Sequence, residues 1–136
     1  MKRVLIFLAV IVGVAALLAF ALVDVIPPRA LTATRMQILK ARVLEFARKH
    51  GELPSALAVL PANQSRDDSS LDGWHREILF EVSTSGIVTF RSLGRDGLFG
   101  GSGEDADITR SFIARDAQGR WSDKTVGWSE DTFRTR

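Results

Sequence analysis

The chain contains no cysteine, and it has almost no excess of one charge. Without cysteine, neither a disulfide framework nor a thiolate metal site can stabilise a small domain. The formal net charge of +2 comes from Lys2 and Arg3 alone, because the rest of the chain carries 16 basic and 16 acidic residues. A nucleic-acid-binding protein needs a basic surface that neutralises phosphates. We therefore expect no nucleic-acid partner.

Recognisable catalytic motifs are also missing. The sequence contains no GxSxG, HExxH or phosphate-binding loop. Of its two histidines, His50 falls at the end of a predicted helix, where a basic side chain suits the helix dipole. His75 follows Trp74 and is typical of a half-exposed packing residue. We expect that the protein is not an enzyme.

One long run of residues lacks charge altogether. Residues 4–23 form an uncharged, mostly apolar stretch of 20 residues, which as a helix would span roughly 30 Å, the thickness of a bilayer's hydrocarbon core. Lys2 and Arg3 precede it and Asp24 follows, so the positive-inside rule places the N-terminus in the cytoplasm. The sequence predicts a single-pass membrane anchor over residues 1–28 and one exported domain over residues 29–136. A cleaved signal peptide is the alternative, because residues 19–21 (AFA) offer small residues at a suitable spacing.

The pattern beyond the apolar run predicts a helix over residues 29–50. Pro27 and Pro28 should interrupt helical structure just before it. Gly51 suits the left-handed residue that ends a helix. Apolar residues recur at intervals of three and four and predict a buried stripe: Met36, Leu39, Val43, Phe46 and Ala47.

Alternating patterns later in the chain predict two β-hairpins. The first joins residues 78–82 and 87–91 through the turn at 83–86, and the second joins residues 111–115 and 120–122 through the turn at 116–119. A long helix followed by a small antiparallel sheet is an α+β arrangement, in which the helix stripe and one sheet face bury each other.

Residues 93–108, between the hairpins, contain five glycines and four carboxylates among 16 residues. Glycine allows positive φ angles, and clustered carboxylates repel one another unless a cation lies among them. Ca²⁺ accepts six to eight oxygen ligands in flexible geometry, so the pattern favours calcium over magnesium. Asp96 is the first candidate ligand and Asp107 the second, with Asp105 and Glu104 weaker; an extended backbone would point Asp105 and Asp107 the same way. An acidic solvated loop is the alternative.

Three motifs occur in an order that resembles a known family. They are GELP at residues 51–54, DGW at 72–74, and SLGRDG at 92–97 continuing through GG at 100–101 to ADI at 106–108. This order is similar to that of the major pseudopilin of type II secretion. The resemblance covers residues from about 29 to 108 and, by analogy, implies an N-terminal helix packed on an antiparallel sheet with a calcium loop.

The resemblance also implies ligands, partners and a location. Asp96 and Asp107 match calcium-loop positions, with Asp105 less certain and the carbonyls of Leu93 and Ser102 as backbone ligands. The ion would be structural. The family implies a bacterial inner-membrane protein with a periplasmic domain that assembles with other pseudopilins or secretion-machine components, or with further copies of itself.

The sequence departs from the family in two places. The apolar run has Gly13 as its only glycine and no acidic residue, whereas the family has a glycine before its cleavage site and a glutamate five residues into the run. His75 replaces the glycine that follows the family's tryptophan. A membrane-tethered periplasmic binding module, which captures an exported protein or envelope component, is therefore the alternative function.

Overall fold

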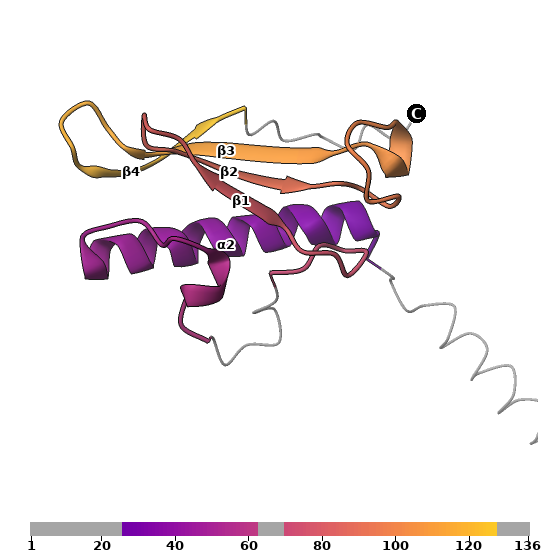
Figure 1. Cartoon of the computed structure of the whole chain (residues 1–136), viewed down its shortest axis with the longest axis horizontal. Helices are drawn as coiled ribbons and strands as arrows, with labels where there is room; N and C mark the ends of the chain where they lie inside the picture. Colours follow the sequence, from indigo (N-terminus) through magenta and orange to yellow (C-terminus); the bar gives the residue numbers. More distant parts are fainter. Residues whose placement is uncertain (1–25, 63–69, 128–136) are drawn as a thin grey trace, which may run out of the picture.

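The computed structural model describes residues 26–62 and 70–127. The predicted anchor run, residues 4–23, lies outside this part of the chain, and no helix within it is long and apolar enough to cross a membrane. One long helix and four strands make up the domain (Figure 1): α2 Pro28–His50, β1 Leu79–Val82, β2 Ile87–Ser92, β3 Ile108–Arg115 and β4 Trp121–Val126. Two short 3₁₀ helices, η1 Leu57–Val59 and η2 Gly103–Asp105, lie in the connections.

The four strands form one antiparallel sheet in the order β1-β2-β3-β4, so each strand pairs with its neighbour in sequence. Both predicted hairpins are confirmed, because Val82 pairs with Val88 across the first turn and Arg115 with Trp121 across the second. β3 begins three residues before its predicted start, and β4 extends four residues beyond its predicted end.

The ends of α2 follow the expected signals. The helix begins at Pro28, one residue before the predicted start, because proline is well suited to the first helical turn, where its missing N–H is not needed. At the other end Gly51 adopts the left-handed conformation, with φ 79°, and its N–H donates to the carbonyl of Ala47.

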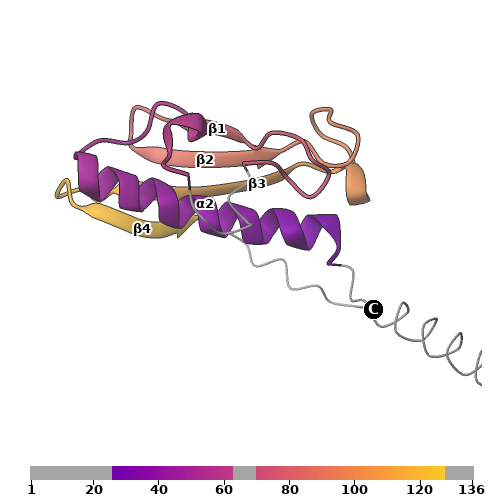
Figure 2. The ribbon, with the colours of Figure 1, turned by 90° about the horizontal axis from the view of Figure 1, so that it is seen from below.

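The core lies between α2 and one face of the sheet, as two views of the ribbon show (Figure 1, Figure 2). Phe46, expected on the buried stripe, is only half-buried and stacks on His50, with ring centroids 4.3 Å apart. Leu44, which the predicted stripe does not include, is buried in the core. The α+β arrangement is confirmed, and its fully buried apolar side chains are Met36, Leu39, Val43 and Ala47 from the helix and Val88, Phe90, Phe112 and Ala114 from the sheet.

The domain has two distinct ends. One end holds the first turn of α2 and the connection between β2 and β3, residues 93–107, which we call the glycine-rich loop (Figure 1). We refer to this end as the loop pole. The opposite end holds the C-terminus of α2 and the turn between β3 and β4, residues 116–119.

Candidate functional site

The glycine-rich loop is closed at its base by strand pairing. Ser92 and Ile108 are partners in the β2–β3 ladder, so the two ends of the loop lie side by side. Within the loop, the N–H of Arg95 donates to the carbonyl of Glu104 over 2.9 Å, and the N–H of Asp107 donates to the carbonyl of Gly100 over 3.0 Å. The loop is therefore a compact, internally bonded unit.

At two positions in the loop only glycine fits, because the backbone there passes close to another part of the same loop. Gly94 has φ 66°, and a Cβ there would lie 2.5 Å from the carbonyl oxygen of Asp105. Gly101 has φ 80°, and a Cβ there would also lie 2.5 Å from that oxygen. The prediction that the glycines serve positive φ angles is confirmed at these positions, and close packing is a second reason for them.

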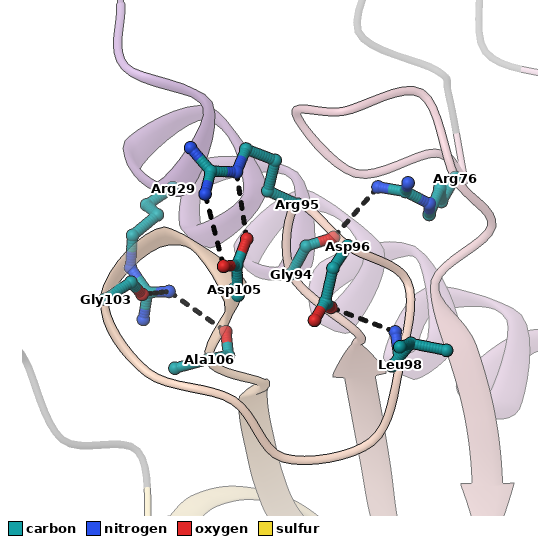
Figure 3. Close-up of polar contacts among 9 residues, drawn as sticks. All are labelled: Arg29, Arg76, Gly94, Arg95, Asp96, Leu98, Gly103, Asp105 and Ala106. Carbon is teal, nitrogen blue, oxygen red and sulfur yellow. Dashed lines mark hydrogen bonds and ion pairs between the residues drawn. The ribbon is translucent and has the colours of Figure 1, made fainter.

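Arginines from outside the loop bind its carbonyl groups (Figure 3). Nη1 of Arg29, in the first turn of α2, donates to the carbonyls of Gly103 over 2.9 Å and Ala106 over 3.0 Å. Nη1 of Arg76 donates to the carbonyl of Gly94 over 3.0 Å. No local pattern indicates the contacts of Arg29, since this residue is more than 70 residues from its partners.

Asp105 is engaged by a third arginine. Its Oδ1 accepts from Nε of Arg95 over 2.9 Å and its Oδ2 accepts from Nη2 over 3.2 Å, so the pair is bidentate (Figure 3). The hydrogen bond to Asp105, followed by the charge of that carboxylate, raises the pKa of the Arg95 guanidinium. Asp105 lies in η2 rather than in extended backbone, so the condition under which it would point the same way as Asp107 is not met.

The other two candidate aspartates bind loop amides. Oδ1 of Asp96, an exposed residue, accepts from the N–H of Leu98 over 3.0 Å. Oδ1 of Asp107 accepts from the N–H of Gly100 over 3.2 Å, and its Oδ2 lies 3.9 Å from Nη1 of Arg91. Each carboxylate thus stabilises a different part of the loop.

The chemical type of the candidate ligands suits the predicted calcium site, but their side chains alone do not form a cluster around one point. All candidate ligands are oxygen atoms, which suits a hard cation. Within residues 26–62 and 70–127, however, no three acidic, histidine or cysteine side chains are grouped closely enough to hold a metal ion. A calcium cage here would depend on backbone carbonyls such as those of Leu93 and Ser102, and the Ser102 carbonyl already accepts from the N–H of Asp105 over 3.1 Å. The ion and its five predicted ligands stay a prediction.

A buried carboxylate supports the base of the loop. Asp72 is fully buried. Its Oδ1 accepts from the N–H groups of Trp74 and Arg76, each over 2.9 Å, and its Oδ2 accepts from Oγ of Ser92 over 2.6 Å. The side chain therefore links the turn that contains the DGW motif, residues 72–76, to the end of β2, where the loop begins. We call residues 72–76 the DGW turn. Sequence reasoning singled out the DGW segment but not this role of its aspartate.

The same turn is attached to α2. The N–H of Gly73 donates to Oγ1 of Thr32 over 2.8 Å. A Cβ on Gly73 would lie 2.1 Å from the carbonyl oxygen of Pro28, so a side chain at this position would push the turn away from the helix. Nη1 of Arg35 donates to the carbonyls of Leu71 and Asp72 over 3.1 and 2.7 Å. Polar contacts thus join α2, the DGW turn and the glycine-rich loop at one pole.

Comparison with protein-family models, with curated proteins and with solved structures found no match to this chain.

Proposed function

We propose that the protein is a membrane-anchored, pseudopilin-like structural subunit or accessory protein of a type II secretion or type IV pilus-like machine, with a calcium-stabilised loop and no catalytic activity. The observation that carries this proposal is the glycine-rich loop, which is closed on itself and bound by Arg29 to the first turn of α2. A loop fixed in this way presents one defined surface, as a subunit of an assembly requires.

The DGW turn supports the resemblance independently. His75 has φ 64°, a left-handed backbone conformation that residues other than glycine adopt at a cost in free energy. In the pseudopilin pattern, the residue after the tryptophan is glycine, and His75 stands at that position. The backbone thus has the conformation that the family's glycine would favour, although the residue itself departs from the pattern.

The proposed ion would act on charge and on backbone geometry. Asp96 and Asp107 would supply carboxylate oxygens, and the carbonyls of Leu93 and Ser102 would supply neutral ones. Asp105 is a weaker ligand in this proposal because Arg95 already binds both of its oxygens. The ion would offset repulsion among the loop's carboxylates and would leave the arginine contacts to bind the loop to the rest of the domain.

Calcium should raise the melting temperature of the protein. We expect the full chain in detergent to unfold at a temperature several degrees higher in millimolar calcium than in chelator, because an ion that binds only the folded state stabilises it by mass action. Asp96→Ala should remove most of this difference by deleting a charged ligand.

The matched control is Asp123→Ala, which removes an exposed aspartate from β4, away from the loop. This variant should keep the full response to calcium. Equal melting temperatures of the unmodified protein in calcium and chelator, measured by differential scanning calorimetry, would contradict the calcium site.

A second candidate function is a membrane-tethered periplasmic binding module that captures an exported protein or envelope component. The apolar run favours it, because residues 4–23 contain neither the glycine–aromatic cleavage site nor the glutamate expected of an assembling pseudopilin. In that case the same domain would remain on its anchor and act alone.

Crosslinking in intact cells separates the two functions. A photoreactive amino acid at Gln118, in the exposed turn between β3 and β4, should crosslink the full chain to secretion-machine components or to further copies of itself. The same residue at Ala41, on the exposed side of α2, provides a second position of comparison. Exclusive recovery of a soluble exported protein or an envelope component at both positions would exclude the subunit function and favour the binding module.

A further inference from the structure

The loop pole carries the most exposed large apolar side chains of the described residues. Phe99 is 72% exposed, Leu98 67% and Ile26 60%, whereas no other large apolar side chain in this part of the chain exceeds 49%. Leu98 and Phe99 occupy the tip of the glycine-rich loop, and Ile26 lies two residues before α2. Three such side chains at one end of a small domain make this pole the candidate surface for an apolar contact.

The loop holds its tip outward. Gly97 and Gly100, with φ 72° and 93°, flank Leu98 and Phe99 on either side. The carboxylate of Asp96 accepts from the N–H of Leu98 and fixes the turn into the tip. A Cβ on Gly97 would lie 2.7 Å from Nε of Arg76, so the arginine packs directly against the inner side of this turn. The turn therefore leaves Leu98 exposed, and Phe99, although largely exposed, lies with its ring over the guanidinium of Arg91, 5.7 Å from Cζ to the ring centroid.

The chain places this pole close to the end of the apolar run. Residue 23 ends the run and Pro28 begins α2, so four residues lie between them, and the five steps from one to the other span at most about 18 Å. The interfacial layer on each side of a bilayer is itself roughly 5–8 Å thick. If residues 4–23 span the membrane, the first turn of α2 and the loop bound to it by Arg29 lie at or near that layer.

Charge at the pole favours lipid over a charged partner. The loop and the arginines around it carry four basic side chains, Arg29, Arg76, Arg91 and Arg95, and four acidic ones, Asp96, Glu104, Asp105 and Asp107. Without a bound ion, this balance gives no attraction to a strongly charged protein or polyanion. It suits the headgroups of a zwitterionic leaflet, below which Leu98 and Phe99 would find an apolar environment.

We propose that Leu98 and Phe99 insert into the interfacial layer of the leaflet from which the apolar run emerges, and so fix the orientation of the domain on the membrane. This inference rests on the membrane anchoring in the proposed function. The anchor restricts the domain to the membrane surface, and the loop tip adds a second contact that prevents it from rotating freely about the anchor.

Single-cysteine fluorescence tests the insertion in the full chain, because the absence of native cysteine makes labelling specific. An NBD label is placed by Phe99→Cys at the tip, by Gln118→Cys at the opposite pole and by Ala16→Cys in the apolar run. Each protein is reconstituted into phosphatidylcholine vesicles with and without a lipid that carries a spin-label quencher, at a shallow position for the labels at residues 99 and 118 and at a deep position for the label at residue 16. We expect the label at residue 99 to be quenched at least roughly two-fold more than that at residue 118.

A second labelling position keeps the tip intact. With the label at Ser102, an exposed residue of the same loop, the unmodified tip should give strong quenching, and the double substitution Leu98→Ser and Phe99→Ser should lower it to the level seen at residue 118. Unchanged melting temperatures verify that these variants fold.

The outcomes separate this inference from the function on which it rests. Quenching at residue 16 with equal, weak quenching at residues 99 and 118 would overturn the insertion and leave the anchor standing. No quenching at residue 16 would overturn the anchor and the insertion together. Weak quenching at residue 99 with a blue-shifted NBD emission that is lost when the protein is diluted in lipid would show contact with a second copy and would also overturn the insertion.

Discussion

Asp72 and His75 have different roles in the DGW turn: Asp72 accepts hydrogen bonds, and His75 provides the reversal of the backbone. The fully buried Asp72 carboxylate satisfies the N–H groups of Trp74 and Arg76, which would otherwise lack a partner beneath the loop. His75, between them, takes the left-handed conformation that lets the chain reverse. Among the residues that the structure describes, it is the one non-glycine residue with positive φ. The side chain of His75 is exposed, so the strain is confined to its backbone.

We expect His75→Gly to stabilise the protein. Glycine adopts φ 64° without steric strain, and relief of that strain should exceed the added flexibility of the unfolded chain, for a net gain of about 0.5–1 kcal/mol. Thermal unfolding of the full chain should therefore shift upward by a few degrees. In contrast, Ala41→Gly, at an exposed position inside α2, should cost about 1 kcal/mol. A lower melting temperature for His75→Gly would show that the imidazole makes a compensating contact.

At the scale of elements, the glycine-rich loop is determined by close backbone contact as much as by its hydrogen bonds. The carbonyl oxygen of Asp105 is approached by the backbone at both Gly94 and Gly101. The two sides of the loop can meet there only because neither glycine carries a Cβ. The short helix η2 then returns the chain to β3.

Gly94→Ala and Gly103→Ala distinguish steric contact from backbone strain. Gly94 and Gly103 have similar positive φ angles, 66° and 57°, but a Cβ meets the Asp105 carbonyl at Gly94 and open space at Gly103. We expect Gly94→Ala to lower the free energy of unfolding by about 3–4 kcal/mol and Gly103→Ala by about 1 kcal/mol, measured by urea denaturation. Equal losses of unfolding free energy in the two variants would mean that the loop can widen at Gly94 without steric cost.

The regular elements could be predicted from the sequence because their signals are local. Period-two alternation around 83–86 and 116–119 located both hairpins, and Gly51 located the end of α2. The bracing of the loop could not be predicted, since it depends on Arg29 and on Asp72, which reach the loop only in the folded chain. Composition showed where an acidic, glycine-rich loop would lie. It did not show that Arg95 binds Asp105.

At the scale of the whole molecule, arginines secure both ends of α2 to the rest of the domain. At the loop pole, Arg29 of the helix donates to carbonyls of the loop. At the opposite end, Nη2 of Arg115, on β3, donates to the carbonyl of Gly51 over 2.7 Å, just beyond the helix. The apolar core lies between these two polar attachments.

Arg29→Met should loosen the loop pole without unfolding the domain. It removes two hydrogen bonds from a charged donor and keeps the apolar stem, so we expect the amides of residues 105–107 to exchange hydrogen about ten-fold faster. Amides of β2 and β3 should be little affected. Arg48→Met, on an exposed position of the same helix, is the matched control and should leave loop exchange unchanged. Uniformly faster exchange over the sheet would contradict a local role.

The sequential order of the sheet has a consequence for biosynthesis. α2 precedes all four strands, and its apolar stripe ends about 40 residues before β2, the first strand to contribute fully buried core side chains, so the helix emerges from the ribosome or translocon before the sheet that covers it. At the usual pace of translation this interval lasts several seconds. Once β2 and β3 have emerged, each strand pairs only with its neighbour in sequence, so the sheet can form rapidly and cover α2. A chaperone that recognises apolar helices would therefore act on this chain early and release it as the second hairpin completes.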